Sequence, residues 1–273
     1  MTRVRFAPPR SSPFDSVSIM IGLYVSASGA QAYSQFLDVV SNNIANADTA
    51  GFKREIPVLQ ARPAEDIERG NLPSGMGYRE DVGGGVYLSE TQTEFSMGAI
   101  QSTGNETDLA IADTNGNTFF MVQQGDETLL TRAGNFYRDV QGLLRTQDGS
   151  AVLSDASAPI QTDPRFGFQV SDDGVITQRE TGLQIPIALA QPNSLDDLVQ
   201  AGKNSFRSDG PMLPAAPEDR RVRQGYLEKS TTQPMQEMID MIKASRAYEA
   251  NVRMIQNQDS TIESLINRVL SGE

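Results

Sequence analysis

Two side chains on which much protein chemistry depends are missing from this sequence. Its 273 residues contain no cysteine and no histidine. Without cysteine there is no disulfide, no thiolate nucleophile and no zinc site built on thiolates. Without histidine the commonest general base and metal ligand is lost, and every triad that uses an imidazole is excluded. We therefore expect a protein that is not an enzyme, with no catalytic residue, no metal site and no cofactor.

Basic charge and long apolar runs are also scarce. The chain has 35 acidic and 23 basic residues, a net charge of −12. Nucleic acids and anionic membrane surfaces both select for basic footprints, so we expect neither as a partner. No stretch approaches the roughly 20 apolar residues that span a bilayer, so no membrane insertion is expected. The N-terminus has Pro8, Pro9 and Pro13 but no apolar core, which argues against a cleaved signal peptide.

The N-terminal part of the chain predicts a helix. We expect residues 1–19 to be a disordered extension or the product of a start codon assigned too early, with Met20 opening the first helix. Residues 20–62 hold this helix, which should run to about Ala47, and the segment after it. Gly51 is suited to end the helix in the left-handed conformation. The helical stripe has steps of three and four and consists of Leu23, Ala27, Ala30, Ser34, Leu37, Ser41 and Ile44.

The C-terminal segment, residues 222–273, contains the clearest helix, from Pro234 to about Leu270. A seam with steps of three and four comprises Met238, Met241, Ser245, Tyr248, Val252, Ile255, Asp259, Ile262, Ile266 and Val269. A mostly apolar seam of this length is typical of a coiled coil. At about 1.5 Å per residue, the helix is too long for one small core to cover.

The middle of the chain predicts β-structure. Residues 63–105 are rich in Gly, Ser and Thr and are expected to form an extended linker, and residues 106–221 a β-rich domain. Strands are expected at 108–112, 118–123, 128–132, 136–139, 143–146, 166–170, 175–178 and 186–190. Turn residues separate them at Asn115-Gly116, Gln124-Gly125, Gln141-Gly142, Asp148-Gly149 and Asp173-Gly174. The predicted fold class is α+β, with N- and C-terminal helices paired as a coiled coil and a central small barrel or sandwich.

Acidic residues leave two rival hypotheses open. A glycosidase would need two carboxylates in a cleft, and the adjacent pairs Asp172-Asp173, Asp196-Asp197 and Glu218-Asp219 more readily mark turns. The run Asp113 to Asn117 resembles the start of a calcium loop, but the glycine and glutamate that such a loop requires are absent. A tight turn is the better account. A third alternative is an extracellular adhesin that binds through its β-rich middle.

Three collinear segments resemble one family, the flagellar basal-body rod and hook proteins. Residues 37–54, with Ser41-Asn42-Asn43-Ile44-Ala45-Asn46 and Gly51-Phe52-Lys53-Arg54, are similar to the N-terminal rod signature. Thr103–Ile111, Phe119–Val122 and Thr131–Phe136 resemble the central pattern, and Arg223–Ser230 with Glu237–Asn251 the C-terminal one. The sequence departs from the family at Asn117-Thr118 and at Thr231-Thr232, and residues 1–19 have no counterpart in the family pattern.

This resemblance implies a structural subunit of the rod that polymerises through its terminal helices into a helical tube that transmits torque. It implies other rod and hook subunits as partners, self-association in the rod, and export by the flagellar type III apparatus without a cleaved signal peptide. The location implied is the basal body, in the rod that crosses the periplasm. Residues 242–248 and 254–256 look more like a proximal rod member than a distal one.

The expected assembly interface combines the helical stripes with the N-terminal signature. The asparagines near the end of the first helix also fit a purely local role as caps and turn formers. The residues assigned to the interface are Leu23, Leu37, Asn42, Asn43, Ile44, Asn46, Gly51, Phe52, Met238, Met241, Tyr248, Val252, Ile255, Ile262, Ile266 and Val269.

Overall fold

The computed structural model describes residues 13–62, 84–113 and 115–270. The chain divides into two compact units. We call the first the helical unit; it takes the chain up to Ser41, Ile56–Gln92 and the part from Met238 onward. The second, the β unit, consists of Asn42–Glu55 and Thr93–Glu237. The protein is therefore an α+β structure.

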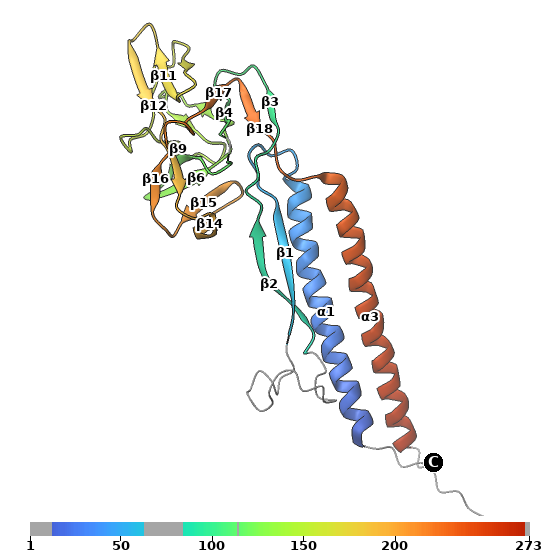
Figure 1. The fold of residues 1–273 in the computed structure, drawn as a ribbon. Helices are drawn as coiled ribbons and strands as arrows, with labels where there is room; N and C mark the ends of the chain where they lie inside the picture. The colour runs from blue at the N-terminus through green and yellow to red at the C-terminus, as the bar shows by residue number, and fades with distance from the viewer. Residues whose placement is uncertain (1–12, 63–83, 114, 271–273) are drawn as a thin grey trace, which may run out of the picture. The chain divides into compact units, whose positions relative to one another are not determined.

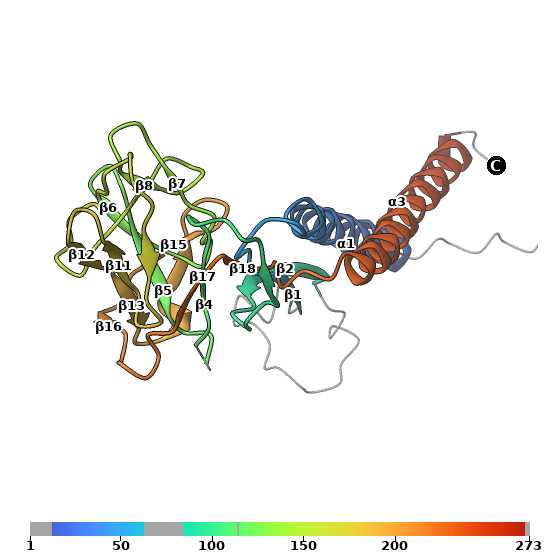
Figure 2. The same ribbon diagram turned by 90° about the horizontal axis from the view of Figure 1, so that it is seen from above.

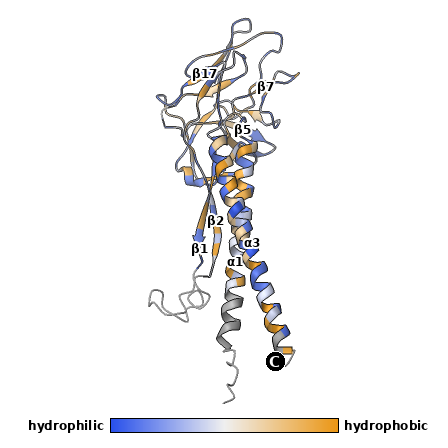
Figure 3. Cartoon of the chain, turned by 90° about the vertical axis from the view of Figure 1, so that its right-hand side faces the viewer, coloured by the Kyte–Doolittle hydropathy of each residue, from blue (hydrophilic) through white to orange (hydrophobic). Residues whose placement is uncertain are grey.

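The helical unit contains most of two long helices, α1 (Pro13–Ala45) and α3 (Pro234–Leu270), which lie side by side (Figure 1). Both ends of α3 are as the sequence predicts, with proline in the first turn, where its missing N–H is not needed. Helix α1 begins before the predicted Met20, so residues 13–19 are helical rather than a disordered extension. Residues 1–12 of that predicted extension lie outside the described residues. Figure 3 shows apolar and polar segments alternating along α3.

A β-hairpin also belongs to the helical unit. Its strands β1 (Glu55–Ala61) and β2 (Val86–Thr93) form a two-stranded sheet. The prediction of a linker over 63–105 is therefore wrong for residues 86–93, because they pair with a strand that the sequence pattern did not reveal. Residues 63–83 of the predicted linker lie outside the described residues. The hairpin contacts α1, where Arg62 Nη1 donates to the Tyr24 hydroxyl at 2.9 Å.

The β unit is built on one large sheet, and Figure 2 shows several of its strands from above. Strands β14, β15, β6, β5, β9, β8 and β7 lie in that order, and β13 pairs with both β5 and β16. In the described part of the chain this path does not close on itself. The strands are β5 (Phe119–Gln124), β6 (Glu127–Thr131), β7 (Tyr137–Arg138), β8 (Leu144–Arg145), β9 (Ala151–Val152), β13 (Leu189–Pro192), β14 (Leu198–Gln200), β15 (Ser205–Ser208) and β16 (Met212–Pro214).

Smaller sheets complete the β unit. Strands β10 (Gln169–Val170), β11 (Val175–Gln178) and β12 (Leu183–Pro186) form one, and a short 3-10 helix, η1 (Leu195–Asp197), follows β13. Two further antiparallel pairs bring the C-terminal part of the unit back to its beginning. They are β3 (Ile100–Ser102) with β18 (Tyr226–Glu228), and β4 (Leu109–Ile111) with β17 (Val222–Gln224).

Predicted turns and strands of the β-rich region are largely confirmed. The glycines of all five predicted turns have positive φ angles, between 62° and 86°. The predicted strands overlap β4, β5, β6, β7, β8, β10, β11 and β13. Strands β3, β9 and β14 to β18 were not predicted, because they show no alternating apolar pattern, and the predicted strand 186–190 reaches only the last residue of β12.

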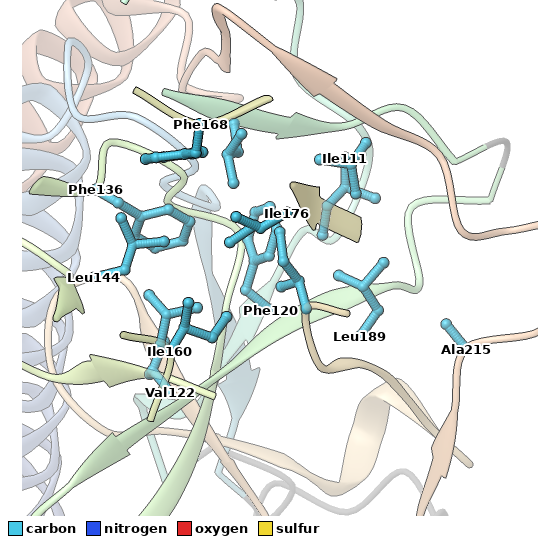
Figure 4. Packing of buried hydrophobic residues seen from close by; sticks show 14 of the residues in the cluster. Ile111, Phe120, Val122, Phe136, Leu144, Ile160, Phe168, Ile176, Leu189 and Ala215 are labelled. Carbon is cyan, nitrogen blue, oxygen red and sulfur yellow. The ribbon is translucent and has the colours of Figure 1, made fainter. Parts of the chain in front are cut away.

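The core of the β unit lies between its sheets, where aromatic and branched aliphatic side chains pack together (Figure 4). Phe120, Leu144 and Ile176 are completely buried there. Fully burying one such side chain stabilises the fold by about 1.5–3 kcal/mol. A second cluster contains Phe119, Leu130, Ala190 and Phe206. Among the described residues, neither α1 nor α3 combines the length and the apolar character that a membrane-crossing helix needs.

Candidate functional site

A cluster of four buried charges lies in the β unit, next to the turn that follows α1. We call Lys53, Asp113, Arg132 and Glu228 the ionic junction; the side chain of each is 0% exposed. Lys53 Nζ donates to Glu228 Oε1 at 2.7 Å. Arg132 Nη1 donates to Glu228 Oε2 at 3.3 Å, and Arg132 Nη2 to Asp113 Oδ1 at 2.8 Å. The two cations and two anions therefore neutralise one another without solvent.

Backbone groups supply further hydrogen-bond partners for Glu228 and Lys53. The N–H of Gly98 donates to Glu228 Oε1 at 2.8 Å, and Lys53 Nζ also donates to the Ser96 carbonyl at 2.6 Å. The Arg132 guanidinium lies 5.4 Å from the centre of the Phe119 ring, which adds a cation–π contact. These partners matter because an isolated charge in a protein interior is strongly unfavourable.

Gly51 brings the turn after α1 close to this junction. Its N–H donates to the Glu228 carbonyl at 2.8 Å, and its φ angle is 68°. A Cβ at this position would lie 2.4 Å from the carbonyl carbon of Arg132. Glycine is therefore required twice, for its left-handed backbone and for the close approach of the Arg132 backbone.

The electrostatics of the ionic junction are dominated by burial. Desolvation lowers the pKa of the Lys53 ammonium below its ordinary value, and the adjacent Glu228 carboxylate offsets this only in part. The buried Lys53–Glu228 pair thus favours one fixed arrangement of the two side chains. Removing either partner should destabilise the fold by much more than the pair contributes, because the other charge would stay buried without its partner.

A second set of contacts joins the end of α1 to the first turn of α3, entirely within the β unit. The Asn43 side chain accepts from the Glu55 N–H at 3.0 Å and donates to the Glu55 carbonyl at 2.8 Å. Asn43 Nδ2 also donates to Glu237 Oε2 at 3.2 Å, and Arg54 Nε donates to the same carboxylate. We call Asn43, Arg54, Glu55 and Glu237 the root contact, because it ties together the ends from which both helices extend.

Thr231 adds to the attachment of the segment before α3. Its hydroxyl accepts from the Arg54 N–H at 2.8 Å, and its N–H donates to the Phe52 carbonyl at 3.1 Å. Thr231 is one of the positions at which the sequence departs from the family pattern, and its side chain makes a hydrogen bond there. At another such position, Thr118 donates its N–H to Asp113 Oδ2 at 3.0 Å.

The residues assigned to the interface from the sequence fall into three groups. Asn43, Asn46, Gly51 and Phe52 are buried and contact their own chain. Leu23, Leu37, Ile44, Met241, Val252, Ile255 and Ile262 are half-buried. Asn42, Met238, Tyr248 and Ile266 are exposed, and the side chain of Val269 lies outside the described residues.

Asn46 and Thr49 have the local role that helix ends favour. Asn46 Nδ2 donates to the Asn42 carbonyl at 2.9 Å, and the Thr49 hydroxyl donates to Asn46 Oδ1 at 3.2 Å. These bonds satisfy polar groups at the end of α1, where the last carbonyls of a helix lack intrahelical partners.

The rival acidic sites have structural partners. Asp113 of the suspected calcium loop pairs with Arg132, and Gly116 forms the tight turn that the sequence favours, with φ at 72°. Asp172, Asp173 and Glu218 line a depression of about 430 Å³ together with three arginines, Arg220, Arg221 and Arg223. Within residues 13–62, 84–113 and 115–270, no three acidic side chains come close enough together to hold a metal ion.

Sequence reasoning did not identify the ionic junction. Lys53, Arg132 and Glu228 lie in polar motifs, where a charged residue ordinarily faces solvent. In the sequence Glu228 follows Tyr226 and Leu227, and the structure shows that Glu228 is the buried residue of this short strand. A charge at such a position needs a partner of opposite sign.

Comparison with protein families matches three parts of the chain. Residues 23–53 match the family described as flagella basal body rod protein. Residues 114–178 match the flagellar hook protein FlgE/F/G D1 domain, and residues 223–268 the flagellar basal body rod FlgEFG protein C-terminal family. Each of the three matches supplies one residue of the ionic junction, namely Lys53, Arg132 and Glu228.

Individual relatives extend over most of the chain. It is 35% identical over 251 residues to the flagellar basal-body rod protein FlgF of Caulobacter vibrioides, which covers 90% of this chain and 97% of the relative. It is 32% identical over 261 residues to the flagellar basal-body rod protein FlgG of Bacillus subtilis, again over 90% of this chain and 97% of the relative. With such identity across nearly its whole length, the chain belongs to the flagellar basal-body rod proteins, a structural family and not a family of enzymes.

Proposed function

We propose that this structural subunit of the flagellar basal-body rod polymerises through its terminal helices into a helical tube that transmits torque. The observation that carries the proposal is an exposed apolar patch on α3. Met238 is 53% exposed, Ile239 44% and Ile242 54%. These three residues, which we call the α3 patch, lie within two turns of the helix.

The α3 patch calls for an additional partner. Apolar surface gains about 25 cal/mol per Å² when it is removed from water, and this gain offsets the entropy lost when chains become ordered. A neighbouring subunit that covers the patch would supply that burial. Contacts that join the front of one subunit to the back of the next, without closing, generate a helical tube.

Finer elements of the proposal concern pairing, partners and export. We infer that α1 and α3 pair as a coiled coil, and that their remaining apolar surfaces bind copies of this chain and other rod and hook subunits. We further infer export through the flagellar type III apparatus without a cleaved signal peptide. The absence of cysteine supports this route, because no disulfide can block the passage of an unfolded chain.

The α3 patch gives a direct test. In a strain that lacks the gene, the double variant Ile239→Gln and Ile242→Gln should express a folded protein but restore neither motility nor rods visible by electron microscopy of the cell envelope. The reason is that glutamine keeps the helix but removes the apolar contact. The matched control, Gln256→Ala with Asn257→Ala, changes two exposed polar residues of the same helix and should restore both.

The outcome is decisive in both directions. Intact rods and normal swimming with the double glutamine variant would overturn the proposal. Circular dichroism of the purified variants must show equal helix content, so that a loss of rods reports assembly and not folding.

A proximal position in the rod is favoured by residues 242–248 and 254–256. An epitope inserted at Val140, which is 87% exposed, provides a label for this position. In electron tomograms the label should lie near the inner-membrane end of the rod. A label confined to the hook end would place the subunit distally.

A further inference from the structure

Helix α3 has a second face, on which small and polar residues replace apolar ones. Ala244 is buried, and Asn251 and Gln258 are half-buried, although most of their neighbours on the helix are exposed. These three residues are spaced by seven, two full turns of a helix, so they lie on one stripe. The stripe is displaced by one residue from the predicted apolar seam, which contains Ser245, Val252 and Asp259.

The stripe of α3 meets the glycines of α1. A Cβ at Gly29 would lie 2.9 Å from Asn251 Oδ1 and 3.1 Å from its Cγ. A Cβ at Gly22 would lie 2.7 Å from Gln258 Nε2. Each amide therefore occupies the space that any larger residue of α1 would fill.

The pairs follow one antiparallel spacing. Moving seven residues forward in α1, from Gly22 to Gly29, corresponds to moving seven backward in α3, from Gln258 to Asn251. The next step of the same spacing sets Phe36 opposite Ala244, a large residue opposite a small one. One step further is the pair Asn43 and Glu237, whose side chains are hydrogen-bonded in the root contact.

We propose that the amides of Asn251 and Gln258, each seated on a glycine of α1, fix the register of α1 against α3 within one subunit. This proposal rests on the proposed function and deepens it, because a fixed register sets the position along α1 at which the α3 patch is presented to neighbouring subunits.

The energetics favour a role for these amides in setting the register of the helix pair over a role in stabilising it. The Oε1 atom of Gln258 is buried and has no hydrogen-bond partner, which costs free energy. A polar residue at a core position of a helix pair is a known way to set register at the expense of stability. A slip by one heptad moves the helices about 10.5 Å along each other. In one direction it sets Asn251 opposite Phe36 in place of Gly29, and the ring excludes the amide.

Because the natural chain has no cysteine, disulfide trapping tests the register cleanly. The full-length double variant Gly29→Cys with Asn251→Cys joins positions in the proposed register. Two matched controls, Gly29→Cys with Gln258→Cys and Gly22→Cys with Asn251→Cys, make the same kinds of substitution one heptad out of register. Bridged cysteines have Cα atoms no more than about 7 Å apart. The in-register pair should therefore oxidise within the monomer at least about tenfold faster than either control.

Two outcomes overturn the proposal. Equal oxidation of all three variants would mean that α1 and α3 have no preferred register, and disulfide-linked dimers in dilute solution would mean that the contact forms between subunits. Neither result affects the test of the α3 patch, so failure of the register and failure of the proposed function are distinguishable.

A cycle without cysteine guards against misfolded variants. Gly29→Ala alone places a Cβ against the Asn251 amide, and this clash opposes the gain in stability that alanine brings over glycine inside a helix. Adding Asn251→Ala removes the clash, so the double variant should melt at a higher temperature than the sum of the two single changes gives, a coupling that independent sites do not show. Strictly additive changes in melting temperature would overturn the proposal as well.

Discussion

The β unit and the helical unit treat large apolar side chains in opposite ways. In the β unit Phe119, Phe120 and Ile176 are completely buried. In the helical unit the α3 patch stays open to solvent, and Leu270 near the end of the same helix is 79% exposed. The β unit therefore contains the partners that these core side chains need.

One set of charged residues in each unit shows a similar difference. The four charges of the ionic junction are sealed inside the β unit, whereas the Glu249–Arg253 pair on α3 is largely exposed. A buried pair contributes a fixed geometry, and an exposed pair contributes little stability. The comparison separates a unit that packs large apolar residues around a core of its own from one that leaves apolar side chains of α3 open to solvent.

The largest effect on the free energy of unfolding is expected when a buried and an exposed glutamate are each replaced by alanine. Glu228→Ala leaves Lys53 and Arg132 without their shared acceptor and should lower the free energy of unfolding by about 3–5 kcal/mol. Glu249→Ala removes a solvent-exposed partner and should change it by no more than about 0.5 kcal/mol. Urea unfolding of both variants measures the difference. Equal losses would show that the ionic junction is not the special site that its burial indicates.

A second pair of variants sharpens the apolar contrast. Ile176→Ala creates a cavity in a completely buried position and should cost about 2–5 kcal/mol in the free energy of unfolding. Ile242→Ala truncates the same side chain on the α3 patch and should change the stability of the isolated chain by within about 0.5 kcal/mol. Thermal unfolding with a probe in each unit checks both values. A large loss with Ile242→Ala would mean that the isolated protein already covers the patch.

The smallest effect concerns pH and an exposed ion pair of the β unit. The hydrogen bond from the Arg165 side chain lowers the pKa of Asp163 from 3.8 to about 2. Because the folded pKa is lower than the unfolded one, the stabilisation is complete above pH 3.8 and is lost as the pH falls to about 2. Arg165→Gln should raise the Asp163 pKa, as followed by carboxyl-carbon NMR. An unchanged midpoint would exclude Arg165 as the cause.

The sequence predicts those elements of the fold that depend on local chemistry. Pro234 and the long periodic segment after it predict both ends of α3, and the five turn glycines predict where strands of the β unit stop. Strand β2 escaped prediction because its exposed polar residues show no alternation, and its pairing with β1 depends on tertiary contacts.

The contact between α1 and α3 was not recognised from the sequence for a related reason. A seam chosen by hydrophobicity selects Val252 and passes over Asn251, although Asn251 is the residue that contacts Gly29. The missing information was which residue of α1 lies opposite Asn251, since an amide fits there only when the opposite residue lacks a Cβ. In the same way, Glu228 is recognisable as a buried anion only when Lys53 and Arg132 are known to lie beside it.

The wide sequence separation within the ionic junction has a consequence for the order in which the protein matures. Lys53 and Arg132 precede their common acceptor Glu228 by 175 and 96 residues. A ribosome completes both cations long before it adds the anion. Strands β17 and β18, which pair with β4 and β3, arrive equally late. These contacts of the β unit consequently cannot form until most of the polypeptide has been made.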